Sequence, residues 1–278
     1  MQKTRLRRYA KLIARMGCNV QKGQDVLLYA GIEQPEFTAM VVDELYKAGA
    51  RKVFVELDYD PLQKLHVRHR SIKSLSTVEN FEIAKLQYMT EKLPCRLFLT
   101  SEDPDGLKGM NTRKQVKGQQ ARYPIVKPYR DAIEGKHQWC IAGVPGTAWA
   151  KKVFPGEPKG RAVERLWEAI LATSRVDDDP IKAWEEHNAN VRSRCEYLNS
   201  LGLDSLEYSS SNGTSLKVGL IDGAIFMGGC EDTLLGKPFN ANIPSEEVFI
   251  SPDRSRAEGI VYSTRPMSYN GQLIENFS

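Results

Sequence analysis

Val26-Leu27-Leu28-Tyr29-Ala30 is a continuous apolar run of strand length, which is typical of a strand buried on both faces of a sheet. An amphipathic helix follows over residues 35–49, with Gly49 as its cap, and Lys52-Val53-Phe54-Val55-Glu56-Leu57 is a second strand. A strand, a helix and a strand in this order form a crossover that pairs the two strands in parallel. This stretch therefore predicts a layered α/β domain with a largely parallel sheet.

The same alternation continues on both sides of this unit. Apolar residues recur at three- and four-residue spacings from Leu6 to Met16, which predicts a helix that stops at Gly17. Downstream, we expect a helix over 78–90, strands over 95–100 and from Trp139, and a helix over 161–174. We assign residues 1–176 to this N-terminal α/β domain.

Residues 177–278 have a different texture, which indicates a second domain. The turn Asp177-Asp178-Asp179-Pro180 suggests either a metal site or the cap of a long helix over residues 181–201, and capping preferences favour the helix. Beyond Gly202, short strands alternate with glycine-rich turns, which is typical of an antiparallel sheet; these strands are expected over 205–209, 215–220, 224–227, 248–250 and 259–263. The end of the chain, residues 272–278, resembles a strand that enters another hairpin, so we expect this β-rich domain to be incomplete.

Composition indicates an ordinary globular protein. The 278 residues are 41% hydrophobic and 27% charged, and the mean hydropathy is −0.44. The longest apolar runs are too short to cross a bilayer, and the basic N-terminus has no apolar signal segment behind it, so we expect a cytoplasmic protein without a membrane partner. The five cysteines are scattered, with no C-x-x-C pair, which favours reduced thiols over disulfides or a zinc knot.

The surface charge does not indicate a nucleic-acid partner. The formal net charge is +4, and local basic clusters lie at Arg5–Arg8 and Lys64–Lys73. No aromatic motif interleaves with them, and a modest positive excess is common on solvated surfaces.

Polar residues follow two of the predicted parallel strands. They are Asp58, Tyr59, Asp60, Ser101, Glu102 and Asp103. Ligands often bind at the carboxyl ends of parallel strands, so these residues could mark a cleft, although polar turns would give the same pattern. No G-x-G-x-x-G or Walker A motif follows the first strand, which argues against nucleotide binding.

One further segment carries a chemical signal. Asn242-Ile243-Pro244-Ser245-Glu246-Glu247-Val248-Phe249 presents two adjacent carboxylates on a short apolar stretch. Adjacent side chains of a strand face opposite ways, so only one of the two glutamates can enter a site directly.

Several motifs together resemble the M29 family of metallo-aminopeptidases, the group of aminopeptidase T and aminopeptidase S, over essentially the whole chain. The motifs are Tyr9-Ala10-Lys11-Leu12-Ile13, residues 17–24, Ala48-Gly49-Ala50, residues 179–184, Gly213-Thr214-Ser215-Leu216 and residues 242–249. The resemblance implies a homodimeric exopeptidase in which two divalent ions, zinc or cobalt, activate a hydroxide that removes N-terminal residues from peptide substrates. It also implies that Glu247 is a metal ligand, that Glu246 lies outside direct coordination, and that residues 177–278 begin an α+β catalytic domain.

The chain departs from the family pattern in its ligands. The resemblance places the other glutamates, two histidines, an aspartate and an active-site tyrosine in a carboxyl-terminal stretch that has no counterpart here, so no catalytic residue is assigned. No histidine follows His187. His66 and His69 lie among Lys and Arg residues that would repel a cation, so we expect both to be surface residues. Ser245 and Ile250 stand where the family commonly has threonine.

Two hypotheses follow. In the first, the sequence is an M29 metal-dependent aminopeptidase whose activity belongs to the full-length protein, and residues 1–278 alone are inactive because most metal ligands are absent. In the second, it is a catalytically inactive α/β binding or scaffold protein derived from this family.

Overall fold

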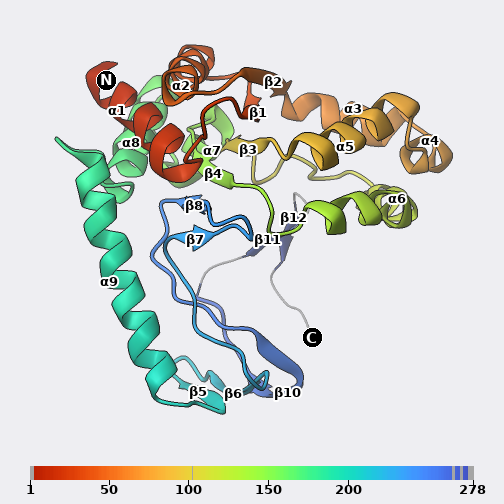
Figure 1. Ribbon diagram of the computed structural model, residues 1–278. Helices are drawn as coiled ribbons and strands as arrows, with labels where there is room; N and C mark the ends of the chain where they lie inside the picture. The colour runs from red at the N-terminus through yellow and green to blue at the C-terminus, as the bar shows by residue number, and fades with distance from the viewer. Residues whose placement is uncertain (1–2, 102, 265–266, 270–271, 275–278) are drawn as a thin grey trace.

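The computed structural model describes residues 3–101, 103–264, 267–269 and 272–274. Its centre is a five-stranded parallel sheet in the order β2 (Lys52–Asp58), β1 (Asp25–Gly31), β3 (Cys95–Thr100), β4 (Trp139–Gly143) and β9 (Asn242–Ile243). The predicted α/β fold with a largely parallel sheet is confirmed (Figure 1).

The predicted strand–helix–strand unit is also confirmed. Helix α2 (Pro35–Ala48) joins β1 to β2, and the two strands pair in parallel from Asp25↔Lys52 to Gly31↔Asp58. Proline is favoured in the first turn of a helix, and Gly49 ends α2 with a φ of 116°, a conformation that favours glycine.

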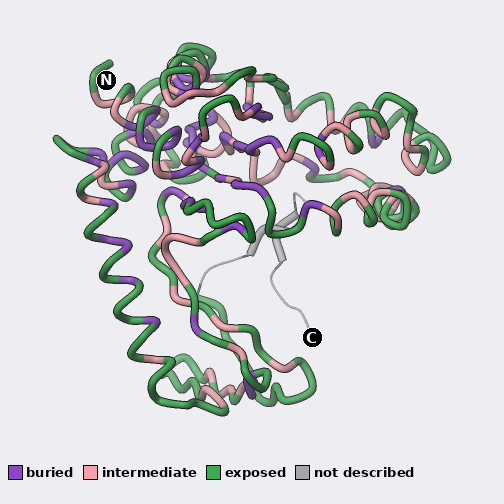
Figure 2. The backbone as a smooth tube through the Cα atoms, in the orientation of Figure 1, coloured by how far each residue is buried: buried purple, intermediate pink, exposed green. Residues whose placement is uncertain are grey.

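Helices cover both faces of the sheet. The side chains of β1 point alternately to the two faces, so each face has apolar side chains for the helices to pack against. Val26, Leu28 and Ala30 join a large core with α1 (Lys3–Leu12), its π-helical continuation η1 (Ile13–Gly17), α2 and α8 (Lys159–Thr173). Leu27 and Tyr29 instead join a smaller cluster with α5 (Asn80–Lys92) and α6 (Thr112–Ile133). Figure 2 shows that burial is concentrated around this layer.

Helix α9 (Pro180–Ser200) runs from this layer to a second, antiparallel sheet (Figure 1). Asp179 caps α9 by accepting a hydrogen bond from the Lys182 N–H at 3.2 Å, as predicted. The buried indole of Trp184 donates to the Ser174 carbonyl oxygen at 2.8 Å and so ties α9 to the end of α8.

The antiparallel region agrees only in part with its prediction. Its sheet has the order β10 (Pro252–Ile260), β6 (Ser215–Leu220), β5 (Ser205–Ser209), and two short hairpins pair β7 (Glu231–Asp232) with β8 (Pro238–Phe239) and β11 (Met267–Tyr269) with β12 (Gln272–Ile274). The strands predicted over 224–227 and 248–250 are wrong, because these segments meet only in an isolated Met227↔Phe249 bridge. The strand predicted over 259–263 begins earlier, as β10. The strand expected within residues 272–278 is present as β12, and residues 275–278 lie outside the described residues.

In the part of the chain that the structure describes, four helices went unpredicted: α3 (Asp60–His69), α4 (Ile72–Ser76), α6 and α7 (Thr147–Val153). Helix α6 contains Pro124 and Pro128, which sequence rules treat as helix breakers. It persists because packing against α4 and α5 stabilises it.

The division into residues 1–176 and 177–278 stays a prediction. One fact bears on it: β9, from the second part, adds an edge strand to the first sheet. Among the helices that the structure describes, none is long and apolar enough to cross a membrane.

Candidate functional site

The segment that carries Glu246 and Glu247 is anchored in the main core. Ile243 is 1% exposed, and β9 pairs with β4 through Ala142↔Ile243. The backbone N–H of Ile141 donates to the carbonyl oxygen of Ala241 at 2.8 Å. This short strand therefore fixes the position of the backbone just before the two glutamates.

Helix α9 holds the next part of the segment. His187 is buried, and its Nε2 lies 2.7 Å from the Ser245 carbonyl oxygen. Because a carbonyl oxygen only accepts, Nε2 donates this bond and is not free to bind a metal ion in this arrangement. The buried amides of Asn188 and Asn240 exchange two hydrogen bonds, at 2.9 and 3.1 Å, next to this contact.

The two glutamates face different surroundings. Glu246 forms an ion pair with Arg175, and the hydrogen bond from that guanidinium holds the pKa of Glu246 below its usual range. The backbone over 245–248 forms no regular strand, so their divergence does not arise from the strand alternation that we expected.

Glu247 is exposed and has a carboxylate neighbour that the sequence did not reveal. Burial, and then the charge of Glu247, raise the pKa of Glu231 on β7. The two side chains are 16 positions apart in the sequence, and no spacing rule connects them. The Met227↔Phe249 bridge joins the two segments that carry them.

These carboxylates do not amount to a metal centre. Across the described ranges, no group of three or more His, Cys, Asp and Glu side chains could hold a metal ion. His66 and His69 lie exposed on α3, as predicted. A two-metal centre needs several such ligands around each ion, so the residues present do not fit one.

A large cleft lies at the carboxyl ends of β1, β2 and β3. It has a volume of about 770 Å³, and Asp58, Tyr59, Asp60, Ser101 and Asp103 line it, so of the two alternatives left open for these residues, a cleft or polar turns, the structure has a cleft. Glu102 lies outside the described residues. Glu33, Glu56, Thr147, Lys151 and Lys159 also belong to its polar lining.

The topology explains the position of this cleft. The chain moves from β1 outward to β2, then returns past β1 to β3, so connections leave β1 and β3 in opposite directions. Such a switch point leaves an open crevice where ligands commonly bind.

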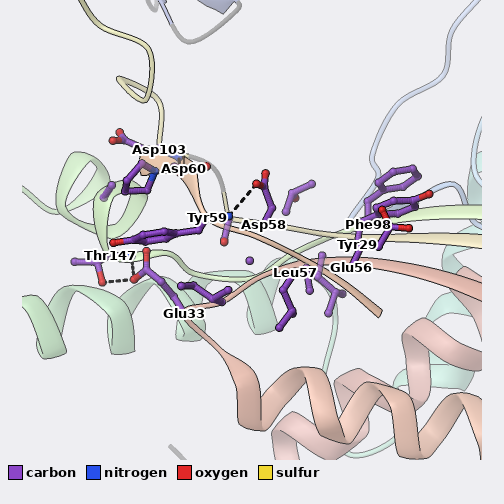
Figure 3. Close-up of a pocket in the computed structure, with 18 of the residues that line it drawn as sticks. Tyr29, Glu33, Glu56, Leu57, Asp58, Tyr59, Asp60, Phe98, Asp103 and Thr147 are labelled. Carbon is purple, nitrogen blue, oxygen red and sulfur yellow. Dashed lines mark hydrogen bonds between the residues drawn. The ribbon is translucent and has the colours of Figure 1, made fainter. Parts of the chain in front are cut away.

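Three of the carboxylates that line the cleft lie at one end of it. Figure 3 shows Glu33, Asp60 and Asp103 there with Tyr59, whereas Glu56 lies at the other end with Tyr29 and Phe98. Asp60 Oδ2 accepts a hydrogen bond from the Asp103 N–H at 2.8 Å. Burial, together with the charges of the neighbouring carboxylates, raises the pKa of Asp60.

Comparison with known proteins shows extensive similarity. Residues 2–278 match the model of the family described as thermophilic metalloprotease (M29). Aminopeptidase PepS of Streptococcus thermophilus is 36% identical over 276 residues, which are 98% of this chain and 67% of that protein. Aminopeptidase T of Thermus thermophilus is 34% identical over 275 residues, 98% of this chain and 67% of that protein.

The structural comparison agrees. The solved structure of wild-type AmpT from Thermus thermophilus has a TM-score of 0.87 and 34% identity, and the match covers 98% of this chain and 68% of that one. The chain thus spans about two thirds of the length of these relatives.

The fold and the anchored glutamate segment define an α/β protein with a mostly parallel sheet and a β-rich extension. The similarity goes further: the chain belongs to the M29 family of metalloproteases. Membership of this family implies the use of a divalent metal ion.

Proposed function

We propose that the protein is a metal-dependent aminopeptidase that removes N-terminal amino acids from peptides. The observation that carries this proposal is the match of residues 2–278 to the M29 family, together with relatives that are named aminopeptidases. Two divalent ions, zinc or cobalt, would supply the activated hydroxide. Peptide substrates, a homodimer and a cytoplasmic location complete the proposal.

Glu247 is the residue we propose as a metal ligand. Its carboxylate is exposed and, unlike that of Glu246, forms no salt bridge among those between described residues. Glu231 supports the assignment, because two nearby carboxylates that repel each other attract a divalent cation. The described residues hold no complete ligand set, so no catalytic step is assigned to them.

A matched pair of variants tests the proposal in the protein expressed from its complete reading frame. Hydrolysis of an amino-acid anilide should stop with a chelator and return with Zn²⁺ or Co²⁺. Activity should be lost in Glu247→Gln and kept in Glu246→Gln, which keeps the shape and removes a charge that already faces Arg175. Full activity of Glu247→Gln would refute its role as a ligand.

The alternative, a catalytically inactive binding or scaffold protein, makes a different prediction. It expects no chelator-sensitive hydrolysis from the complete reading frame. For residues 1–278 alone, the proposal expects weak zinc binding and negligible turnover, because two carboxylates cannot organise two ions. Tight stoichiometric zinc binding by these residues in calorimetry would contradict that expectation.

A further inference from the structure

The cleft at the ends of β1, β2 and β3 is a second candidate site, separate from the segment around Glu247. Among the residues of that segment, 242–250, none lines it. Its volume of about 770 Å³ is within the usual range of pockets that hold small organic molecules. The topological switch between β1 and β3 supplies an independent reason for a ligand site here.

The charged residues that line the cleft indicate which charge its ligand carries. The described lining contains five carboxylates, Glu33, Glu56, Asp58, Asp60 and Asp103, against two lysines, Lys151 and Lys159. Glu56 pairs with Lys85, but no salt bridge between described residues involves any of the other four carboxylates. The cleft therefore favours a cation and disfavours phosphate-bearing ligands.

Neutral donors hold these carboxylates in place. Glu33 accepts hydrogen bonds from the Thr147 hydroxyl and, at 2.9 Å, from the Thr147 N–H. Asp58 accepts from the Tyr59 N–H at 2.8 Å and from Gln63 Nε2 at 3.1 Å. These bonds fix the carboxylates without neutralising their charge, and an ionised carboxylate can accept further bonds.

The geometry favours an organic cation over a metal ion. Among the described residues, these carboxylates form no group that could hold a metal ion. The ring of Tyr59, which is 45% exposed, lies at the acidic end of the cleft. An aromatic face beside carboxylates suits ammonium and guanidinium groups, which gain from both cation–π contact and charge-assisted hydrogen bonds.

We propose that the cleft binds an organic cation, an ammonium or guanidinium group carried by a basic peptide or by a free polyamine. Glu33, Asp58, Asp60 and Asp103 accept hydrogen bonds from the cationic group, and Tyr59 covers its apolar stem. The proposal goes beyond the aminopeptidase activity and does not depend on it.

Calorimetry on the full chain tests the proposal with ligands that are not aminopeptidase substrates. N-acetyl-arginine amide should bind saturably, whereas N-acetyl-citrulline amide, its neutral analogue of nearly the same shape, should bind at least about tenfold more weakly. Spermidine distinguishes the sources: binding of the arginine amide alone indicates a basic peptide, and binding of spermidine alone indicates a polyamine. Measurable and equal binding of the arginine and citrulline amides, or binding of neither the arginine amide nor spermidine, would overturn the proposal.

Variants locate the binding. Asp60→Asn keeps an oxygen for the Asp103 N–H and removes the charge, so affinity for the cation that binds should fall about tenfold. Asp222→Asn, an exposed aspartate outside the cleft, should leave affinity unchanged. Circular dichroism checks folding, and Tyr59→Leu provides a second variant that should also weaken binding. Unchanged affinity in folded Asp60→Asn, or Mn²⁺ competing stoichiometrically for the site, would refute the organic-cation site.

Discussion

Ile243→Ala tests whether β9 belongs to the main core. Ile243 is 1% exposed and lies in the same cluster as Tyr9 and Cys140, although about a hundred residues separate it from its partner strand. The substitution keeps the backbone bonds of β9 and removes only side-chain packing. Its cost therefore measures how firmly the start of the Glu247 segment is held.

The expected cost follows from the buried atoms. Isoleucine has three more carbon atoms than alanine, at about 0.8 kcal/mol each, which gives about 2.5 kcal/mol. The cavity left behind adds about 1 kcal/mol, so the free energy of unfolding should fall by about 3.5 kcal/mol. For a chain of this size, that corresponds to a decrease in Tm of about 6 °C.

Urea unfolding followed by circular dichroism measures this change. Ile225→Ala is the matched control, because Ile225 is 61% exposed and its truncation should cost less than about 0.5 kcal/mol. A loss in Ile243→Ala no larger than in the control would show that β9 is not packed in the core and that the Glu247 segment is not anchored there.

Three further changes test other contacts. Gly17→Ala would place a methyl group 2.7 Å from a cysteine sulfur on β4 and should lower stability by about 1–3 kcal/mol in thermal unfolding. The control Gly160→Ala, where the added methyl group meets no atom within 4 Å, should leave stability unchanged or raise it. Equal effects of the two substitutions would refute the close approach at Gly17. Burial lowers the pKa of His137, so the unfolded chain takes up a proton first as pH falls below about 6.5 and stability decreases there. His137→Gln should flatten the dependence of Tm on pH between 5 and 8, and an unchanged slope would contradict this reasoning. Burial raises the pKa of Asp25, but hydrogen bonds from Arg51 and a tyrosine outweigh burial and hold that pKa below its usual range. Arg51→Met should therefore cost about 2 kcal/mol of unfolding free energy at pH 7, and less when Asp25→Asn is already present. Additive losses of the two substitutions in urea unfolding would contradict an interaction between Arg51 and Asp25.

The sequence predicts the parallel layer well because local signals and packing agree there. The apolar run at residues 26–30 is buried over almost its whole length, and Pro35 and Gly49 mark the ends of α2. Each of these features depends on neighbours in the chain. The cleft at the strand ends could be considered for a related reason, since the polar residues that follow two of the strands are a local signal.

Features that depend on distant packing could not be predicted in the same way. Helix α6 contains two prolines, and its packing against α3, α4 and α5 explains why it persists. The strands expected around Met227 and Phe249 are reduced to one bridge, because a period-two pattern does not specify a partner of sufficient length. Glu231 lies close enough for the charge of Glu247 to raise its pKa, and the two segments meet through the Met227↔Phe249 bridge, which no motif indicates.

The placement of β9 has a consequence for folding. Strands β1 to β4 are complete by residue 143, but the strand that covers the β4 edge begins only at Asn242. During synthesis the sheet therefore stays open at that edge while about a hundred further residues are made, and an open edge is a site of intermolecular pairing. A nascent chain that stops before Asn242 should be prone to aggregate, and closing the sheet is a late, long-range event in folding.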